Sequence, residues 1–142
     1  MSKPHVYDKA KWHYGGDFPR GLSDYQGFVH TGMFVGWLIE HGMISEEFEP
    51  ETARFHSGEL TGTQVYELWD GALVDDMLTE KGNEFAHAYF DFKLGKYLAD
   101  YGELLGRGLP SHYHVQDNGE NYARLKERID ERYADWQRTR RT

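Results

Sequence analysis

The stretch from Ser23 to Gly42, SDYQGFVHTGMFVGWLIEHG, carries apolar residues on nearly every side of a helix. Ser23 with Gln26 three residues later forms a capping-box pattern, which marks a helix start. Gly42 suits the position just past a helix C-terminus. Because a helix that is apolar all round is buried, the pattern predicts a central helix over 23–42 around which the chain packs.

Three positions inside this span need a partner. Gly32 and Gly36 lie four residues apart on one helix face, and each costs up to about 1 kcal/mol relative to alanine. We therefore expect close approach of another backbone, from a long helix predicted over 80–105 or from the terminal helix. Gly82, Gly95 and Gly102 invite a kink or a break in that long helix. For His30 we expect a hydrogen-bonded histidine in or beside the core.

Residues 1–22 are broken by prolines and by Gly15-Gly16, yet they carry several large aromatic side chains. We expect an ordered irregular cover over the helices, with a short helical turn around 8–13. After residue 42, short helices are predicted following Ser45 and over 51–56.

Further cap patterns occur at Thr61/Gln64 and at Asp117/Glu120, the second opening a regular terminal helix. Within residues 71–78 or 109–115, short β pairing is an alternative to helix or loop. The sequence predicts a mainly α, single compact domain, 1–142, of four to six helices: the cover at 1–22 and a helical body at 23–142.

Composition narrows the class of protein. The 142 residues are 15% aromatic, which argues against disorder, and include no cysteine, which excludes disulfides and thiol nucleophiles. The N-terminus lacks the apolar region of a secretion signal, and the longest apolar run, 33–39, is too short to cross a bilayer. We expect a cytoplasmic protein with no membrane association.

Charge is concentrated in one segment. Between Glu40 and Glu80 eleven acidic residues face only Arg54, so this segment carries −10 and the remainder +2 of the net −8. Such a field repels nucleic acid and attracts basic surfaces, although it is also typical of a solvated face. The candidate partner-binding residues are Glu46, Glu47, Glu49, Glu51, Asp75 and Asp76.

Catalytic signatures are missing: the sequence has no P-loop, dinucleotide fingerprint, GxSxG elbow or HExxH motif. This favours a non-catalytic protein without a cofactor. If a metal is bound, the candidate ligands are His13, Asp17, His112 and His114, because histidine and carboxylate are common zinc ligands. The cover and the 109–115 loop would then have to meet over one site.

Several motifs extend over most of the chain: YDxxKWHY from Tyr7, DFP from Asp17, GMFxxW from Gly32, GNxFAxxY from Gly82 and YxxDY from Tyr97. Together they resemble an uncharacterised family of small bacterial proteins classed as a domain of unknown function. The resemblance implies no catalytic residues. Small acidic bacterial domains of this kind recur as immunity proteins beside secreted toxins.

Two hypotheses follow. The first is a non-catalytic binding protein, an immunity protein that neutralises a basic toxin domain by binding and blocking it, with the acidic segment raising the association rate. The second is a small metal-binding protein or enzyme that uses His13, Asp17, His112 and His114. Self-association into a homo-oligomer through the aromatic surface is a further alternative.

Overall fold

The computed structural model describes residues 5–16 and 18–140. The described chain is mainly helical with one small antiparallel sheet, so the predicted fold class is confirmed. No helix in this part is long and apolar enough to cross a bilayer. The elements are β1 (Val6–Lys9), α1 (Ala10–Tyr14), η1 (Asp24–Gly27), α2 (Val29–Glu40), η2 (Glu46–Phe48), α3 (Glu49–His56), α4 (Gly62–Leu68), β2 (Ala72–Val74), η3 (Asp75–Met77), α5 (Glu80–Phe85), the π-helical η4 (Ala86–Phe90), α6 (Tyr97–Leu105), η5 (His112–His114) and α7 (Gly119–Arg140).

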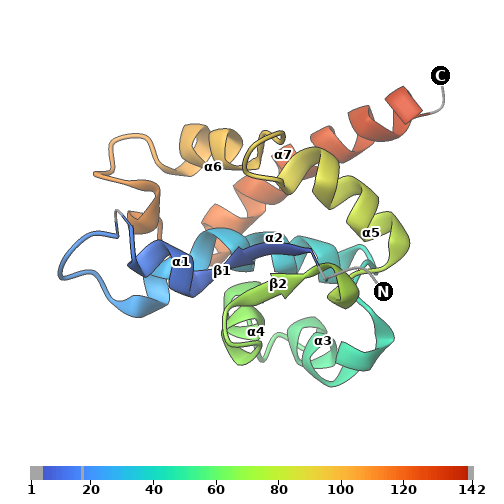
Figure 1. The fold of residues 1–142 in the computed structure, drawn as a ribbon, viewed down its shortest axis with the longest axis horizontal. Helices are drawn as coiled ribbons and strands as arrows, with labels where there is room; N and C mark the ends of the chain where they lie inside the picture. Colours follow the sequence, from blue (N-terminus) through green and yellow to red (C-terminus); the bar gives the residue numbers. More distant parts are fainter. Residues whose placement is uncertain (1–4, 17, 141–142) are drawn as a thin grey trace.

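Helix α2 is the core of the molecule, since every residue from Val29 to Ile39 is buried. In Figure 1 it crosses the middle of the fold, with α3 and α4 below it and α5, α6 and α7 above. The predicted start at Ser23 is wrong. The Ser23 side chain caps nothing, and residues 24–27 form the 3₁₀ turn η1, so the α-helix begins only at Val29.

The glycines of α2 allow it to touch α4 at backbone distance. A Cβ atom on Gly32 would lie 2.4 Å from the Cα of Thr63, and one on Gly62 would lie 2.4 Å from the carbonyl oxygen of Gly32. The close approach expected for the glycine pair is therefore present, but its main partner is α4 and not the 80–105 segment. Gly36 also faces Tyr122 of α7, the terminal helix.

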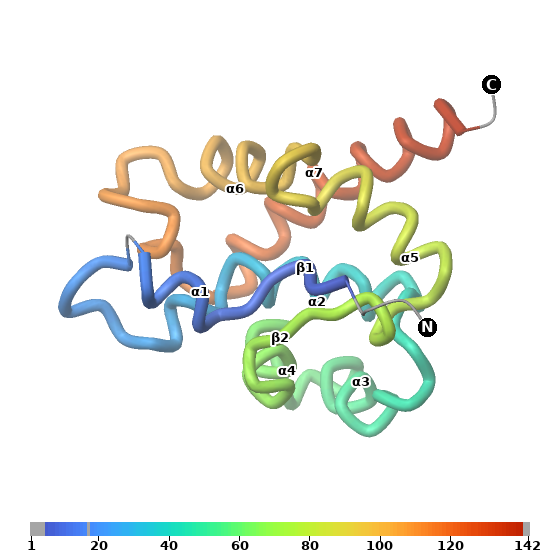
Figure 2. Tube along the Cα trace, in the orientation of Figure 1, coloured from blue at the N-terminus to red at the C-terminus, as the bar shows by residue number. Residues whose placement is uncertain are grey.

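The helix predicted over 80–105 is interrupted, as its glycines allow: η4 ends at Phe90, and α6 begins only at Tyr97 (Figure 2). The Asp91 carboxylate accepts hydrogen bonds from the backbone N–H groups of Lys93 and Leu94, both at 2.9 Å. A Cβ on Gly95 would lie 1.9 Å from the carbonyl oxygen of Tyr89, so this loop requires glycine.

The sheet joins the N-terminal segment to the region after α4. Strand β1 pairs antiparallel with β2, with Val6 opposite Val74 and Asp8 opposite Leu73, and the register shifts between Val6 and Asp8. Pairing within 71–78 was predicted, but its partner in the N-terminal cover was not. Residues 112–114 in the other candidate range form the 3₁₀ turn η5.

Two of the predicted helix caps have different outcomes. Thr61 and Gln64 form the capping box expected at the start of α4. Helix α7 does not use Asp117 as its cap. Instead, the Asn118 side chain accepts a hydrogen bond from the backbone N–H of Asn121. The Asp117 carboxylate accepts hydrogen bonds from the hydroxyls of Tyr25, Thr61 and Thr63.

A buried carboxylate attaches α7 to α6. Asp100 is 2% exposed and accepts hydrogen bonds from Arg128 at 2.9 Å, from Arg132 at 2.8 and 2.9 Å, and from the Tyr89 hydroxyl at 2.7 Å. Burial raises the pKa of Asp100, but its hydrogen bonds and charge interactions with the arginines outweigh burial and hold that pKa below its ordinary value. The pairing satisfies a charge that would otherwise be costly to bury.

We predict that Gly62→Ala destabilises the fold, because the new methyl group would meet the backbone of Gly32 and Gly36 at 2.4–2.7 Å. Overpacking of this kind costs about 1–3 kcal/mol, measured as the free energy of unfolding in urea. Gly102→Ala in α6 is the matched control. Its Cβ has no neighbour within 4 Å, so it should leave stability unchanged or raise it by up to about 1 kcal/mol. Equal stability of Gly62→Ala and wild type would contradict the contact.

Candidate metal centre

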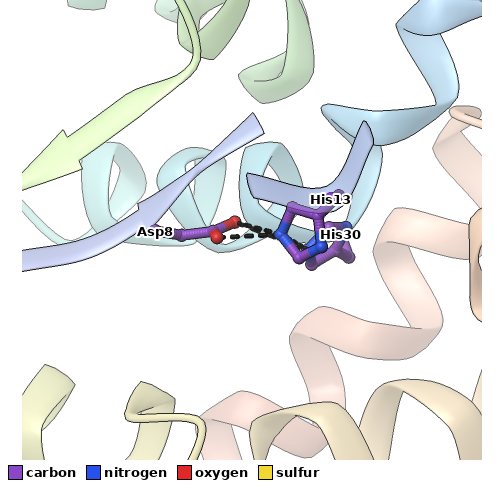
Figure 3. A group of neighbouring side chains, drawn as sticks. All are labelled: Asp8, His13 and His30. Atoms are coloured by element: carbon purple, nitrogen blue, oxygen red, sulfur yellow. Dashed lines mark hydrogen bonds and ion pairs between the residues drawn. The ribbon is translucent and has the colours of Figure 1, made fainter. Parts of the chain in front are cut away.

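Three elements bring one carboxylate and two imidazoles together beside the N-terminal half of α2. Asp8 comes from the irregular part of β1, His13 from α1 and His30 from α2. The bulge in β1 and the immediate start of α1 allow Asp8 and His13 to face the same point. Figure 3 shows the Asp8 carboxylate and the His13 ring directed at one another, with His30 adjoining them.

The donor atoms are closely spaced. His13 Nε2 lies 3.1 Å from Asp8 Oδ2 and 3.2 Å from His30 Nε2, and His30 Nε2 lies 3.5 Å from Asp8 Oδ2. Ligands bonded to a metal at about 2.1 Å are separated by about 3.0 Å in octahedral and about 3.4 Å in tetrahedral geometry. The three separations therefore match those around a single ion.

Burial makes the cluster unusual. The side chains of Asp8 and His30 are 0% and 1% exposed, and that of His13 is 14% exposed. Buried ionisable groups are rare unless they are paired or coordinate a metal. The cluster therefore has the properties of a buried charge pair that could also hold a metal ion.

Outer contacts orient two of the three groups. The Thr31 hydroxyl donates to Asp8 Oδ2 at 2.6 Å, and His13 Nδ1 lies 2.6 Å from the Tyr113 hydroxyl. The backbone around Tyr113 is itself held in place, because the Gln26 side-chain amide donates to the carbonyl oxygens of Tyr113 and Val115. Second-shell contacts of this kind fix the ring orientation of metal-binding histidines.

The environment sets the charge of each group. Burial raises the pKa of Asp8, but hydrogen bonds from His13 and His30 outweigh it and hold the carboxyl pKa below its ordinary range. Burial lowers the pKa of His30, and it lowers that of the nearby His112 to about 4. The site therefore combines a carboxylate with a neutral His30 imidazole, the forms in which these side chains bind metals.

Hydrogen bonds satisfy the two Nε2 atoms only through a shared or a long contact. The two Nε2 atoms face each other, so at most one hydrogen can lie between them. If the His13 Nε2–H donates to Asp8, an N–H on His30 Nε2 has only Asp8 Oδ2 as an acceptor, at the long distance of 3.5 Å. A cation that accepts the lone pairs of both Nε2 atoms and one carboxylate oxygen removes the conflict.

The sequence-predicted metal ligands are only partly brought together. His13 is in the centre and His112 lies beside it, with its ring centroid 5.2 Å from that of His30. His114 instead bonds the Ser111 hydroxyl through Nδ1, and Asp17 falls outside the described residues. The cover and the 109–115 loop do meet over one site, because Tyr113 contacts His13.

Sequence reasoning missed Asp8 as a ligand candidate and assigned His30 to the core. His30 is buried and hydrogen-bonded as expected, but its partners are the other members of the centre. The only local signal was the pair Asp8 and His13, five residues apart at the start of a predicted helical turn. His30 had no such signal, because it lies in an apolar helix.

The predicted partner-binding acids lie on a different part of the surface. Glu46, Glu47, Glu49 and Asp76 are exposed, whereas Glu51 and Asp75 are half-buried. The backbone brings their two segments together, since Ile44 pairs with Leu78 and the Ser45 N–H donates to the Met77 carbonyl. Glu51 also accepts a hydrogen bond from the Trp69 indole at 3.2 Å.

A cleft of about 520 Å³ lies between α2, the α3–α4 loop and the start of α7, and none of the three donors lines it. Its main charged groups already have partners: Glu40 pairs with Lys126, and Asp117 accepts three hydroxyls. The cleft is therefore a less specific candidate than the buried centre.

The model of a family described as a domain of unknown function (DUF7832) matches residues 6–115. The chain belongs to this family. Neither the curated proteins nor the solved structures contain a significant match. Asp8, His13, His30 and the turn that carries His112 and Tyr113 all lie within the matched residues, whereas α7 lies beyond them.

We predict that the metal-free protein loses stability as the pH falls below about 6.5. Because the folded-state pKa values of His30 and His112 are lowered, the unfolded chain takes up protons from pH 6.5 downwards while the folded protein resists them. For His112 the displacement from 6.5 to about 4 corresponds to about 3 kcal/mol at most. The Asp8 contribution is present above its ordinary pKa of 3.8 and is lost only in stronger acid.

Urea unfolding in a chelator at pH 7.5, 6, 5 and 4 measures this dependence. His112→Gln should show a shallower decline between pH 6.5 and 4, and the exposed His56→Gln should follow wild type. Parallel curves for wild type and His112→Gln would contradict the buried, neutral state of His112.

Proposed function

We propose that this protein binds a divalent transition-metal ion through Asp8, His13 and His30. The observation that carries the proposal is the 3.1–3.5 Å spacing of three donor atoms from three elements at a buried point. Surface carboxylates and histidines come together by chance without a metal, whereas burial of this set with two facing Nε2 atoms carries a cost that a bound ion would offset.

The donor set selects the class of metal. Two imidazoles and one carboxylate suit zinc, iron(II), cobalt and nickel, and they disfavour calcium and magnesium, which prefer all-oxygen sites. Without cysteine there is no thiolate to favour copper(I). Three protein ligands leave at least one coordination position for water or a small ligand.

The chain's own residues would make the bound ion a link between segments. Asp8 and His13 belong to the N-terminal segment and His30 to the central helix. Binding only to the folded state would therefore hold β1 and α1 against α2 and raise the unfolding free energy by mass action. At a free metal concentration one hundred times the dissociation constant, the gain is about 2.7 kcal/mol.

We predict that protein purified without a histidine tag and stripped with a chelator binds about one equivalent of Zn²⁺, with a rise in melting temperature. His13→Gln should weaken zinc binding about 100-fold or more, because it removes one of three metal ligands. The variant should still fold, since the His13 side chain is 14% exposed and lies at the edge of the core. Isothermal titration and thermal unfolding measure the two quantities.

His114→Gln and His56→Gln are the matched controls, since each removes an imidazole outside the centre and should bind zinc as wild type does. Binding of less than about 0.1 equivalent, with no change in melting temperature on adding zinc, iron(II), cobalt or nickel, would refute the proposal.

A second proposal is that the protein is an immunity protein that neutralises a basic toxin. The feature that supports it is the exposed acidic group on η2, α3 and η3, where Glu46, Glu47 and Glu49 lie close to Asp76 through the Ile44–Leu78 pairing. Complementary charge of this kind mainly raises association rates. A homo-oligomer that uses the aromatic surface remains an alternative, and light scattering across a concentration series tests it.

We predict that replacing Glu46, Glu47 and Glu49 by lysine slows association with a toxin domain encoded beside this gene by about tenfold or more at low salt. The matched control reverses three exposed acids of α7, Glu120, Glu127 and Glu131, and should change the rate much less. An unchanged rate in the first variant, or the same loss in both, would contradict steering by this surface.

A further inference from the structure

Within the described residues, two of the three proposed ligands have an outer hydrogen-bond partner and the third does not. Thr31 supports Asp8, and Tyr113 supports His13. His30 Nδ1 is buried and has no hydrogen-bond partner within the described residues. A metal-binding histidine almost always donates its second ring N–H to an acceptor, so this atom indicates an unfinished pair.

A complementary atom lies in the adjacent ring. His112 Nε2 is also buried without a hydrogen-bond partner in the described part of the chain. The His30 and His112 rings meet edge-on, with centroids 5.2 Å apart and planes at 85°. In two imidazoles joined by an N–H···N bond of about 2.9–3.0 Å, each nitrogen lies about 1.1 Å from its ring centre, so the centroids are separated by about 5.2 Å.

We infer that His112 is a positioning residue for the metal centre: its Nε2 accepts the hydrogen of His30 Nδ1 once the rings rotate to align the two atoms. This inference rests on the proposed metal site. The bond would hold His30 in the tautomer whose Nε2 lone pair faces the ion. Consecutive residues of η5, His112 and Tyr113, would then support the two histidine ligands.

The geometry favours this outer role over direct ligation. Asp8, His13 and His30 offer donor atoms that all lie within 4.8 Å of one another, and His112 is not a member of that group. Among the described residues, the Tyr101 hydroxyl is also buried without a partner, and its ring lies 6.2 Å from that of His30 and 6.4 Å from that of His112. Because a tyrosine hydroxyl reaches about 2.8 Å beyond its ring centre, Tyr101 is the competing partner for His30, and the tests below include it.

The first test is the zinc affinity of the full chain. Loss of an outer-shell partner lowers metal affinity 10–100-fold, so His112→Ala should show this loss with one equivalent still bound at saturation. His112→Gln, whose amide oxygen can accept the same hydrogen, should recover most of it. His114→Ala from the same turn and Tyr101→Phe should bind as wild type does.

The second test detects the bond itself. In the zinc-bound, ¹⁵N-labelled protein, the His30 Nδ1–H should give a slowly exchanging resonance with scalar coupling across the hydrogen bond to His112 Nε2. With cadmium-113 in place of zinc, the coupling to the metal should appear at the nitrogens of His13 and His30 only. A purely structural role for His112 would produce neither the coupling nor the rescue by glutamine.

The two proposals fail in different ways. If wild type binds no metal, the proposed function is refuted. If wild type binds zinc but His112→Ala is unchanged within about threefold, or if cadmium couples to His112, only the inference about His112 is overturned. Loss of affinity in Tyr101→Phe together with an unchanged His112→Ala would overturn it in favour of the tyrosine.

Discussion

The burial of α2 on every side is the constraint on which the rest of the structure depends. Eleven consecutive residues of this helix are buried, so partners must cover it all round. Close backbone contact with α4 covers one side, and aromatic residues of the α5–α6 region cover another, with Phe90 stacked on Phe34 at 4.5 Å. The remaining elements complete the shell.

The same constraint explains how a polar centre arises within an aromatic core. Thr31 and His30 lie on a helix that has no solvent-exposed side, so their polar atoms must find partners in other elements. Asp8 from the N-terminal strand supplies a charge to both. The N-terminal segment is therefore more than a cover, because it brings the carboxylate that these buried groups require.

The sequence predicted the features that depend on local chemistry. The buried central helix, the Thr61 capping box and the terminal amphipathic helix follow from periodicity and cap residues. Features fixed by contacts between distant segments were missed: β2 pairs with the N-terminal strand β1, and Asp117 accepts hydrogen bonds from three hydroxyls of other segments and does not cap its own helix. Of the three proposed metal ligands, the sequence identified only His13, as a histidine in a candidate metal site. Asp8 and His30 were not predicted as ligands, because their proximity depends on packing between distant segments.

The attachment of α7 bears on how this family can vary. The family match ends at residue 115, yet Asp100 within it receives its charge partners from Arg128 and Arg132 beyond it. A buried carboxylate without such partners costs about 3–5 kcal/mol. A relative that dispensed with the last helix would therefore need a neutral residue at position 100, and the two changes should be inherited together.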